Sequence, residues 1–217
     1  MRRLRCAENS IHDAGVGRTS NGRGKRATVC YIKVTSPHTD VAESNWYYDA
    51  VTWADGRGII DSASQSTFGA SLPMSRGMTA MLLYRLEDSP SNVRATSFMD
   101  VGTDYKEAVS WAASCGLMSG YGNNRFGPND TLTREQMAAV LYRYARYKGI
   151  DTSRRTDISH YSDAKSVSSY AFDPICWANC EGLITGTSAT TLSPSKTITR
   201  AEAVAIFMRF CDRFDAQ

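Results

Sequence analysis

The sequence has no long apolar segment. Its longest uninterrupted apolar run covers residues 203–208, far short of the roughly 20 residues of a membrane-spanning helix. The basic start Met1–Arg5 is followed by polar residues and glycine, where a signal peptide would have an apolar core. We therefore expect neither membrane insertion nor a secretory leader. The 42% hydrophobic and 22% charged residues are typical of a folded protein.

Signatures of metal and nucleotide binding are also missing. The chain has three histidines and six cysteines without a Cys-x-x-Cys pair, so a zinc site has few ligands to draw on. Cys176 and Cys180 lie four residues apart, which favours small buried side chains on one helix face. The segment Gly22–Arg26 lacks the leading glycine and the following serine or threonine of a phosphate-binding loop. We expect no metal and no cofactor.

Positive charge is concentrated at the beginning of the chain. Residues 1–36 hold eight Lys and Arg against two acidic residues, a net charge of +6, whereas residues 37–217 carry −3. A body that binds nucleic acid would carry a basic face, so we expect no nucleic-acid partner. Residues 26–35 have a strand-like pattern but no sheet to join. We expect residues 1–37 to be a basic, poorly ordered extension.

The remainder of the chain contains a threefold repeat. Three tryptophans each stand 23 residues before an arginine, and the three blocks align between these anchors without a gap. The anchor pairs are Trp53 with Arg76, Trp111 with Arg134, and Trp177 with Arg200. We place the repeats at residues 38–90, 96–150 and 160–213. The second linker is eight residues longer than the first, and the additional residues lie within 151–162.

Each repeat predicts a helix, a loop and a second helix. Apolar residues around each tryptophan form a narrow stripe, and a glycine five residues after it (58, 116 or 182) is expected to end the first helix. The second helix has an i, i+3, i+4, i+7 stripe, clearest at Met137, Val140, Leu141 and Tyr144. Such short helices are unstable alone. We expect an all-α body of three helical hairpins that pack on each other.

The second helices of repeats 2 and 3 begin with capping-box sequences. Thr133 and Thr199 are the expected capping residues, and Gln136 and Glu202 follow each of them three positions later. These four residues therefore have a structural explanation.

The arginine that follows the capping residue is harder to explain. A cation in the first turn of a helix is disfavoured by about 0.3–1 kcal/mol, yet all three repeats keep it. One interpretation is structural: a nearby aspartate, namely Asp40, Asp100 or Asp163, pairs with it. The other is an anionic ligand held by the guanidinium and the helix N-terminus. The two are compatible if the aspartate orients the arginine.

Together these motifs resemble the S-layer homology domain. The resemblance rests on Asp-Val, Ala-Val-x-Trp-Ala, Gly-Leu or Gly-Ile, Phe-x-Pro and Thr-Arg-x-Glu/Gln, and covers residues 38–213. It implies three repeats packed as a pseudo-threefold spindle. It also implies a non-catalytic module at the bacterial cell surface that binds secondary cell-wall polysaccharide, often with a pyruvylated sugar.

The resemblance also implies a set of site residues. The motif arginine carries over to Arg134 and Arg200, and less securely to Arg76, because repeat 1 has Ser62 and Ala70 where the others have glycine and proline. The polysaccharide-binding residues we expect are Arg134, Arg200, Arg76, Asp100, Asp163, Gly120 and Gly186. Trp53, Trp111 and Trp177 are interpreted as core, and Trp46, Tyr47 and Tyr48 either face a sugar or pack ordinarily.

Three classes of function compete. An enzyme is disfavoured because the carboxylates and arginines recur in every repeat, whereas a catalytic site is usually unique. A helical-repeat module for protein partners would expose apolar grooves in place of arginine-lined ones. An anchoring module agrees best with the repeats, either by itself or as a fragment of a larger surface enzyme. Its partner would be a cell-wall polysaccharide or a peptidoglycan-linked polymer.

Overall fold

The computed structural model describes residues 36–214, and six α-helices form within this range. They are α1 (Tyr48–Arg57), α2 (Arg76–Leu86), α3 (Lys106–Ser114), α4 (Arg134–Tyr147), α5 (Phe172–Cys180) and α6 (Arg200–Phe214). Short 3-10 turns at Thr103–Tyr105, Ala164–Ser166 and Ser169–Ala171 precede α3 and α5. Within residues 36–214 the chain forms isolated β-bridges but no strand. The predicted all-α class is confirmed.

The basic extension falls almost entirely outside the described residues. Only Ser36 and Pro37 of residues 1–37 are described, and the strand-like segment 26–35 is not.

The helices begin and end where the repeat predicts. Gly58, Gly116 and Gly182 follow the first helices with φ between 61° and 72°, a left-handed conformation that favours glycine. The stripe of α4 is buried, with Met137 and Leu141 at 0% exposure. Trp111 and Trp177 are buried as expected, whereas Trp53 is only partly buried against the core.

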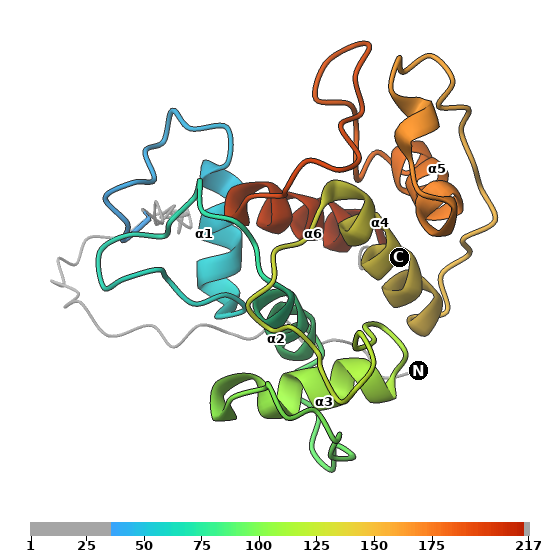
Figure 1. Cartoon of the computed structure of the whole chain (residues 1–217). Coiled ribbons are helices and arrows are strands. Elements are labelled where there is room, and N and C mark those ends of the chain that lie inside the picture. The colour runs from blue at the N-terminus through green and yellow to red at the C-terminus, as the bar shows by residue number, and fades with distance from the viewer. Residues whose placement is uncertain (1–35, 215–217) are drawn as a thin grey trace, which may run out of the picture. The chain divides into compact units, whose positions relative to one another are not determined.

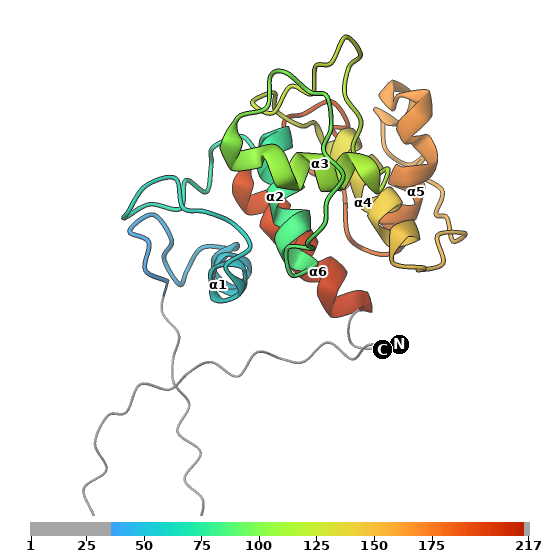
Figure 2. The same cartoon turned by 90° about the horizontal axis from the view of Figure 1, so that it is seen from below.

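The helices that pack together come from different repeats. The pairs are α2 with α3, α4 with α5, and α1 with α6, and each pair lies side by side in Figure 1. Figure 2 shows α3 crossing α2 and α5 beside α4 from a second direction. The expected packing against neighbouring repeats is confirmed, whereas the expected pairing of the two helices within one repeat is wrong. An apolar stripe must be covered, but it does not specify which copy of the repeat covers it.

This pairing closes on itself. The second helix of repeat 1 covers the first helix of repeat 2, the same holds for repeats 2 and 3, and α6 of repeat 3 returns to α1 of repeat 1. The spindle shape stays a prediction, but each repeat contributes to two inter-repeat junctions. We call these the 1–2, 2–3 and 3–1 junctions.

Three loop residues connect the junctions by a ring of backbone hydrogen bonds. Met74 N–H donates to Ile198 O (2.9 Å), Ile198 N–H to Leu132 O (2.9 Å), and Leu132 N–H to Met74 O (3.1 Å). All three side chains are at most 1% exposed. Each residue stands 21 positions after the tryptophan of its repeat. The ring therefore joins the equivalent residue of all three repeats.

The second helices also begin on another repeat. The first two N–H groups of an α-helix have no partner within it. In α6, Arg200 N–H donates to Leu72 O (2.8 Å) and Ala201 N–H to Ala70 O (3.1 Å), both in repeat 1. In the same way, the first two N–H groups of α2 donate to carbonyl groups in the loop of repeat 2, and those of α4 donate to carbonyl groups in the loop of repeat 3.

A single repeat should therefore not fold alone. In a chain of residues 96–150, α3 and α4 would both lose the helix that covers them, along with the loop carbonyls that start α4. We expect little helical circular dichroism and no cooperative melting for this segment, in contrast to residues 38–213. A monomeric single repeat that melts cooperatively would contradict the closed pairing.

Candidate functional site: the junctions between repeats

The repeat arginines lie buried at the junctions. Arg76, Arg134 and Arg200 are 9%, 6% and 2% exposed, and burial lowers the pKa of each guanidinium group. Each guanidinium donates to two carbonyl groups in the loop of the next repeat. Arg200 donates through Nε to Phe68 O (3.0 Å) and through Nη2 to Asp61 O. The corresponding acceptors are Phe126 O and Ser119 O for Arg76, and Leu192 O and Thr185 O for Arg134.

The repeat aspartates bind the same loops from within their own repeat. Asp100 accepts hydrogen bonds from Phe126 N–H and Gly127 N–H, both at 2.8 Å, and these bonds lower the pKa of its carboxyl group. Asp163 accepts from Leu192 N–H and Ser193 N–H (2.8 and 2.7 Å), which lowers its pKa although burial opposes this.

Asp40 follows the same pattern in repeat 1. Burial acts to raise the pKa of its carboxyl group, but hydrogen bonds from the N–H groups of residues 68–70 outweigh burial and lower it.

Arginine and aspartate therefore meet through a shared residue. The N–H of Phe68 donates a hydrogen bond to the Asp40 carboxylate, and the carbonyl of Phe68 accepts one from Nε of Arg200. The same relation links Asp100 to Arg76 and Asp163 to Arg134, each through one loop residue. The expected direct Arg–Asp pair is replaced by a loop that both side chains hold.

The predicted glycines shape these loops by close packing. A Cβ at Gly120 would lie 2.4 Å from Arg125 O and 2.5 Å from a ring atom of Phe98, and one at Gly186 would lie 2.5 Å from Tyr161. Both positions therefore exclude any larger residue. They support the turn that presents the carbonyl groups to the arginines.

The capping boxes are present at both expected positions. Thr133 N–H donates to the Gln136 side chain (2.9 Å), and Gln136 N–H donates back to Thr133 Oγ1 (3.3 Å). Thr199 and Glu202 form the same reciprocal pair at 2.9 and 3.2 Å. Glu202 also accepts from Lys196 Nζ at 3.1 Å.

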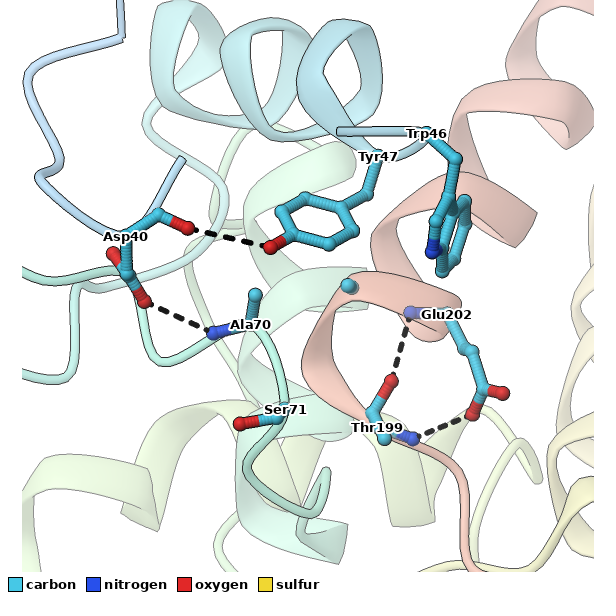
Figure 3. A pocket seen from close by; sticks show the side chains of 8 residues that line it. Asp40, Trp46, Tyr47, Ala70, Ser71, Thr199 and Glu202 are labelled. Carbon is cyan, nitrogen blue, oxygen red and sulfur yellow. Dashed lines mark hydrogen bonds between the residues drawn. The ribbon is translucent and has the colours of Figure 1, made fainter. Parts of the chain in front are cut away.

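Two cavities are found at the 3–1 junction. The first measures about 310 Å³ and is lined by Asp40, Trp46, Tyr47, Ala70, Ser71, Thr199, Ala201 and Glu202. Figure 3 shows the Tyr47 ring pointing its hydroxyl at Asp40, with the Trp46 indole beside Glu202. Tyr47 donates to Asp40 O at 3.3 Å, and Trp46 packs edge-on against Tyr47 with 64% of its surface exposed. An open aromatic face beside polar groups suits a sugar ring.

The second cavity has Arg200 in its wall. It measures about 200 Å³ and is lined by residues 59–63, Met78 and Met81 of repeat 1, Arg200 of repeat 3 and, at its edge with the 1–2 junction, Tyr105 of repeat 2. Nη1 of Arg200 lies 3.5 Å from the Met78 sulfur. Nε and Nη2 donate to carbonyl groups, whereas Nη1 donates only to this sulfur, a weak acceptor, so Nη1 is the part of the guanidinium that an anionic ligand could take over.

Arg200 lies 4.8 Å from the centre of the Phe68 ring, and at the 1–2 junction the corresponding arginine has two such rings. The Arg76 guanidinium lies 4.6 Å from the centre of the Tyr121 ring and 4.5 Å from that of Phe126. The residue at the repeat position of Tyr121 is Ala63 at the 3–1 junction, where it lines the second cavity. The sequence alone does not reveal this difference, because it shows only that the position varies.

Among residues 36–214, no three His, Cys, Asp or Glu side chains gather as a cation site, and every helix is too short or too polar to span a bilayer.

The aspartate bonds predict an acid-sensitive fold. A lowered pKa in the folded state means that Asp100 contributes stability above its unfolded pKa of about 3.9, and that this is lost as the pH falls toward the lower folded value. We expect Asp100→Asn to lower the melting temperature at pH 7 and to cost progressively less below about pH 4. Asp104→Asn, at an exposed position, is the control. A pH-independent cost would contradict the role of the carboxylate.

The arginine bonds predict a loss of stability that lysine cannot restore. Hydrogen bonds from a charged donor contribute about 1.5–3 kcal/mol each, so Arg200→Ala should cost roughly 3–6 kcal/mol in unfolding free energy. Arg200→Lys should cost nearly as much, because one ammonium group cannot reproduce the fork. Chemical denaturation measures both, with exposed Arg94→Ala as the control. If Arg200→Ala unfolded like the parent, the guanidinium would not be what holds the loop.

Comparison with known proteins identifies the repeat. The model of the S-layer homology domain matches residues 39–77, 97–138 and 160–204. An amylopullulanase of Thermoanaerobacterium thermosulfurigenes is 28% identical over 76% of this chain and 9% of its own length. An endoglucanase of Bacillus sp. (strain KSM-635) is 26% identical over 78% of this chain and 18% of its own.

A surface-layer protein shows the same kind of match. The surface-layer 125 kDa protein of Lysinibacillus sphaericus is 26% identical over 80% of this chain and 15% of its own length. The chain therefore spans less than a fifth of each of these three proteins. The relatives include both enzymes and surface-layer proteins, so what they share with this chain is the repeat region. With three family matches in tandem over more than half of its length, the chain belongs to the S-layer homology domain family.

Proposed function

We propose that this chain is a non-catalytic anchoring module that binds anionic cell-wall polysaccharide through a groove between repeats. Its family and its relatives among surface-layer and cell-surface proteins point to the bacterial cell surface. The observation that carries the proposal is the pair of cavities at the 3–1 junction, one with an exposed indole and the other with a guanidinium group.

The two cavities suit different parts of a charged sugar polymer. The first offers the open face of Trp46 and hydrogen-bonding groups from Ser71 and Glu202, a combination that suits a neutral sugar ring. The second offers Nη1 of Arg200, which suits a carboxylate such as that of a pyruvylated sugar. A polymer with both groups could contact both cavities.

The sequence-predicted site residues enter this proposal chiefly as the framework of the grooves. Arg134, Arg200 and Arg76 hold the loops from one side, and Asp100 and Asp163 hold them from the other. Gly120 and Gly186 set the turns. An arginine that already donates to two carbonyl groups would meet a ligand end-on through Nη1 and not through the whole fork.

Trp46 provides the direct test. Trp46→Ala should weaken co-sedimentation with polysaccharide-bearing Gram-positive sacculi by about tenfold or more, since a contact of 1.4 kcal/mol corresponds to a factor of ten. Its melting temperature should change little, because most of the side chain is exposed. Phe172→Ala, an aromatic residue 50% exposed at the start of α5, is the matched control.

Removal of the polymer from the sacculi should abolish binding of the parent chain. The same fraction of chain bound before and after removal would contradict a polysaccharide ligand. Soluble polymer fragments should also shift the fluorescence of the parent chain to shorter wavelength, because Trp46 is the most exposed of the four tryptophans.

A further inference from the structure

The three junctions share a backbone but differ at one side chain. The residue after each repeat arginine is Gly77 at the 1–2 junction, Glu135 at the 2–3 junction and Ala201 at the 3–1 junction. The N–H of each donates to a carbonyl oxygen in the loop of the next repeat, at 2.8, 2.9 and 3.1 Å. The accepting residue stands 17 positions after the tryptophan of that repeat. The backbone of the three junctions is therefore equivalent. The space beside this residue, on the side that faces the start of the next repeat's first helix, can be compared directly between junctions.

At the 1–2 junction a tyrosine occupies this space. A Cβ at Gly77 would lie 2.9 Å from Cδ2 of Tyr105, so the ring rests on the glycine backbone. Tyr47 holds the same repeat position at the 3–1 junction. There Ala201 has a Cβ that prevents so close an approach, and Tyr47 donates its hydroxyl to Asp40 O.

At the 2–3 junction a buried carboxylate occupies the space. Glu135 is 8% exposed and accepts hydrogen bonds from Ser168 N–H (2.9 Å), Ser168 Oγ (2.8 Å) and the Tyr170 hydroxyl (3.3 Å). Burial and the neighbouring carboxylate raise the pKa of Tyr170 to about 12. Tyr170 holds the repeat position of Trp46. Its side chain is still 51% exposed, but its hydroxyl is bonded to the buried carboxylate, whereas the Trp46 indole has no such bond to the residue after the arginine.

At the 3–1 junction the space is the larger cavity. Ala201 lines it together with Trp46, Tyr47 and Ser71, and its volume is about 310 Å³. Figure 3 shows Tyr47, Ser71 and Thr199, at the start of α6, on different sides of this cavity.

We propose that the residue after the repeat arginine selects the binding junction, so that the polymer binds this chain at the 3–1 junction and is excluded from the other two. This rests on the proposed polysaccharide binding and specifies where it occurs. Ala201 keeps the site open because it is too small to fill it and too large to let Tyr47 close it. At the 1–2 junction Gly77 leaves room for the Tyr105 ring, which closes the equivalent space. At the 2–3 junction the Glu135 side chain itself closes it.

The test places the same side chain at the same repeat position in two junctions. Ala201→Gln fills the open cavity without adding charge, and Glu135→Gln keeps the size of the side chain in a closed one. With polysaccharide-bearing sacculi, Ala201→Gln should weaken binding by about tenfold or more. Glu135→Gln should bind within about twofold of the parent chain.

A second pair of substitutions lies in the loops that face the same two junctions. Ser71 and Ser195 are both exposed and both stand 18 positions after a tryptophan. Ser71→Tyr should block the open cavity, and Ser195→Tyr, at the 2–3 junction, should not affect binding. This pair leaves the helices unchanged, so it decides the question even if Ala201→Gln fails to fold.

The outcomes separate the two proposals. Folded Ala201→Gln and Ser71→Tyr variants that bind like the parent would overturn the choice of junction, as would equal losses in Glu135→Gln and Ser195→Tyr. A parent chain that binds sacculi equally with and without polysaccharide would instead overturn the proposed function, and the choice of junction with it.

Discussion

Buried peptide groups that find their partners in another repeat hold this fold together. The ring formed by Met74, Leu132 and Ile198 takes one backbone bond from each repeat, and the starts of α2, α4 and α6 add two more at every junction. A buried N–H or carbonyl group left without a partner costs about 1–3 kcal/mol. No repeat can satisfy these groups alone, so the three loops and the helices attached to them depend on one another.

The same constraint explains the cation in the first turn of the second helices. An arginine there opposes the helix dipole by about 0.3–1 kcal/mol. Two hydrogen bonds from a charged donor to buried carbonyl groups contribute about 1.5–3 kcal/mol each, so they outweigh the dipole. Arg76, Arg134 and Arg200 therefore have a structural reason to be retained. A ligand at Nη1 would be a second use of a group that already belongs to the framework.

The sequence predicted the helices, their glycine ends and the capping boxes, because side-chain type and spacing report local structure. It did not predict the pairing of α2 with α3 or of α1 with α6, because an apolar stripe fits any copy of its partner. Nor did it reveal the acceptors of the arginines. Phe68 and Asp61 accept through backbone carbonyl groups, which every residue has and which therefore leave no mark in the sequence.

The structure also indicates where such a repeat can change without loosening its junctions. An altered arginine would release two carbonyl groups, and an altered aspartate would release the amide groups that it holds. The residue after the arginine is different. What it contributes at all three junctions is a backbone N–H bonded to the next repeat, which glycine, glutamate and alanine supply equally. Gly77, Glu135 and Ala201 can therefore differ while the backbone stays the same. A threefold framework can thus hold three unequal surfaces, and variation at this position changes the space open to a ligand without altering the bonds that keep the repeats together.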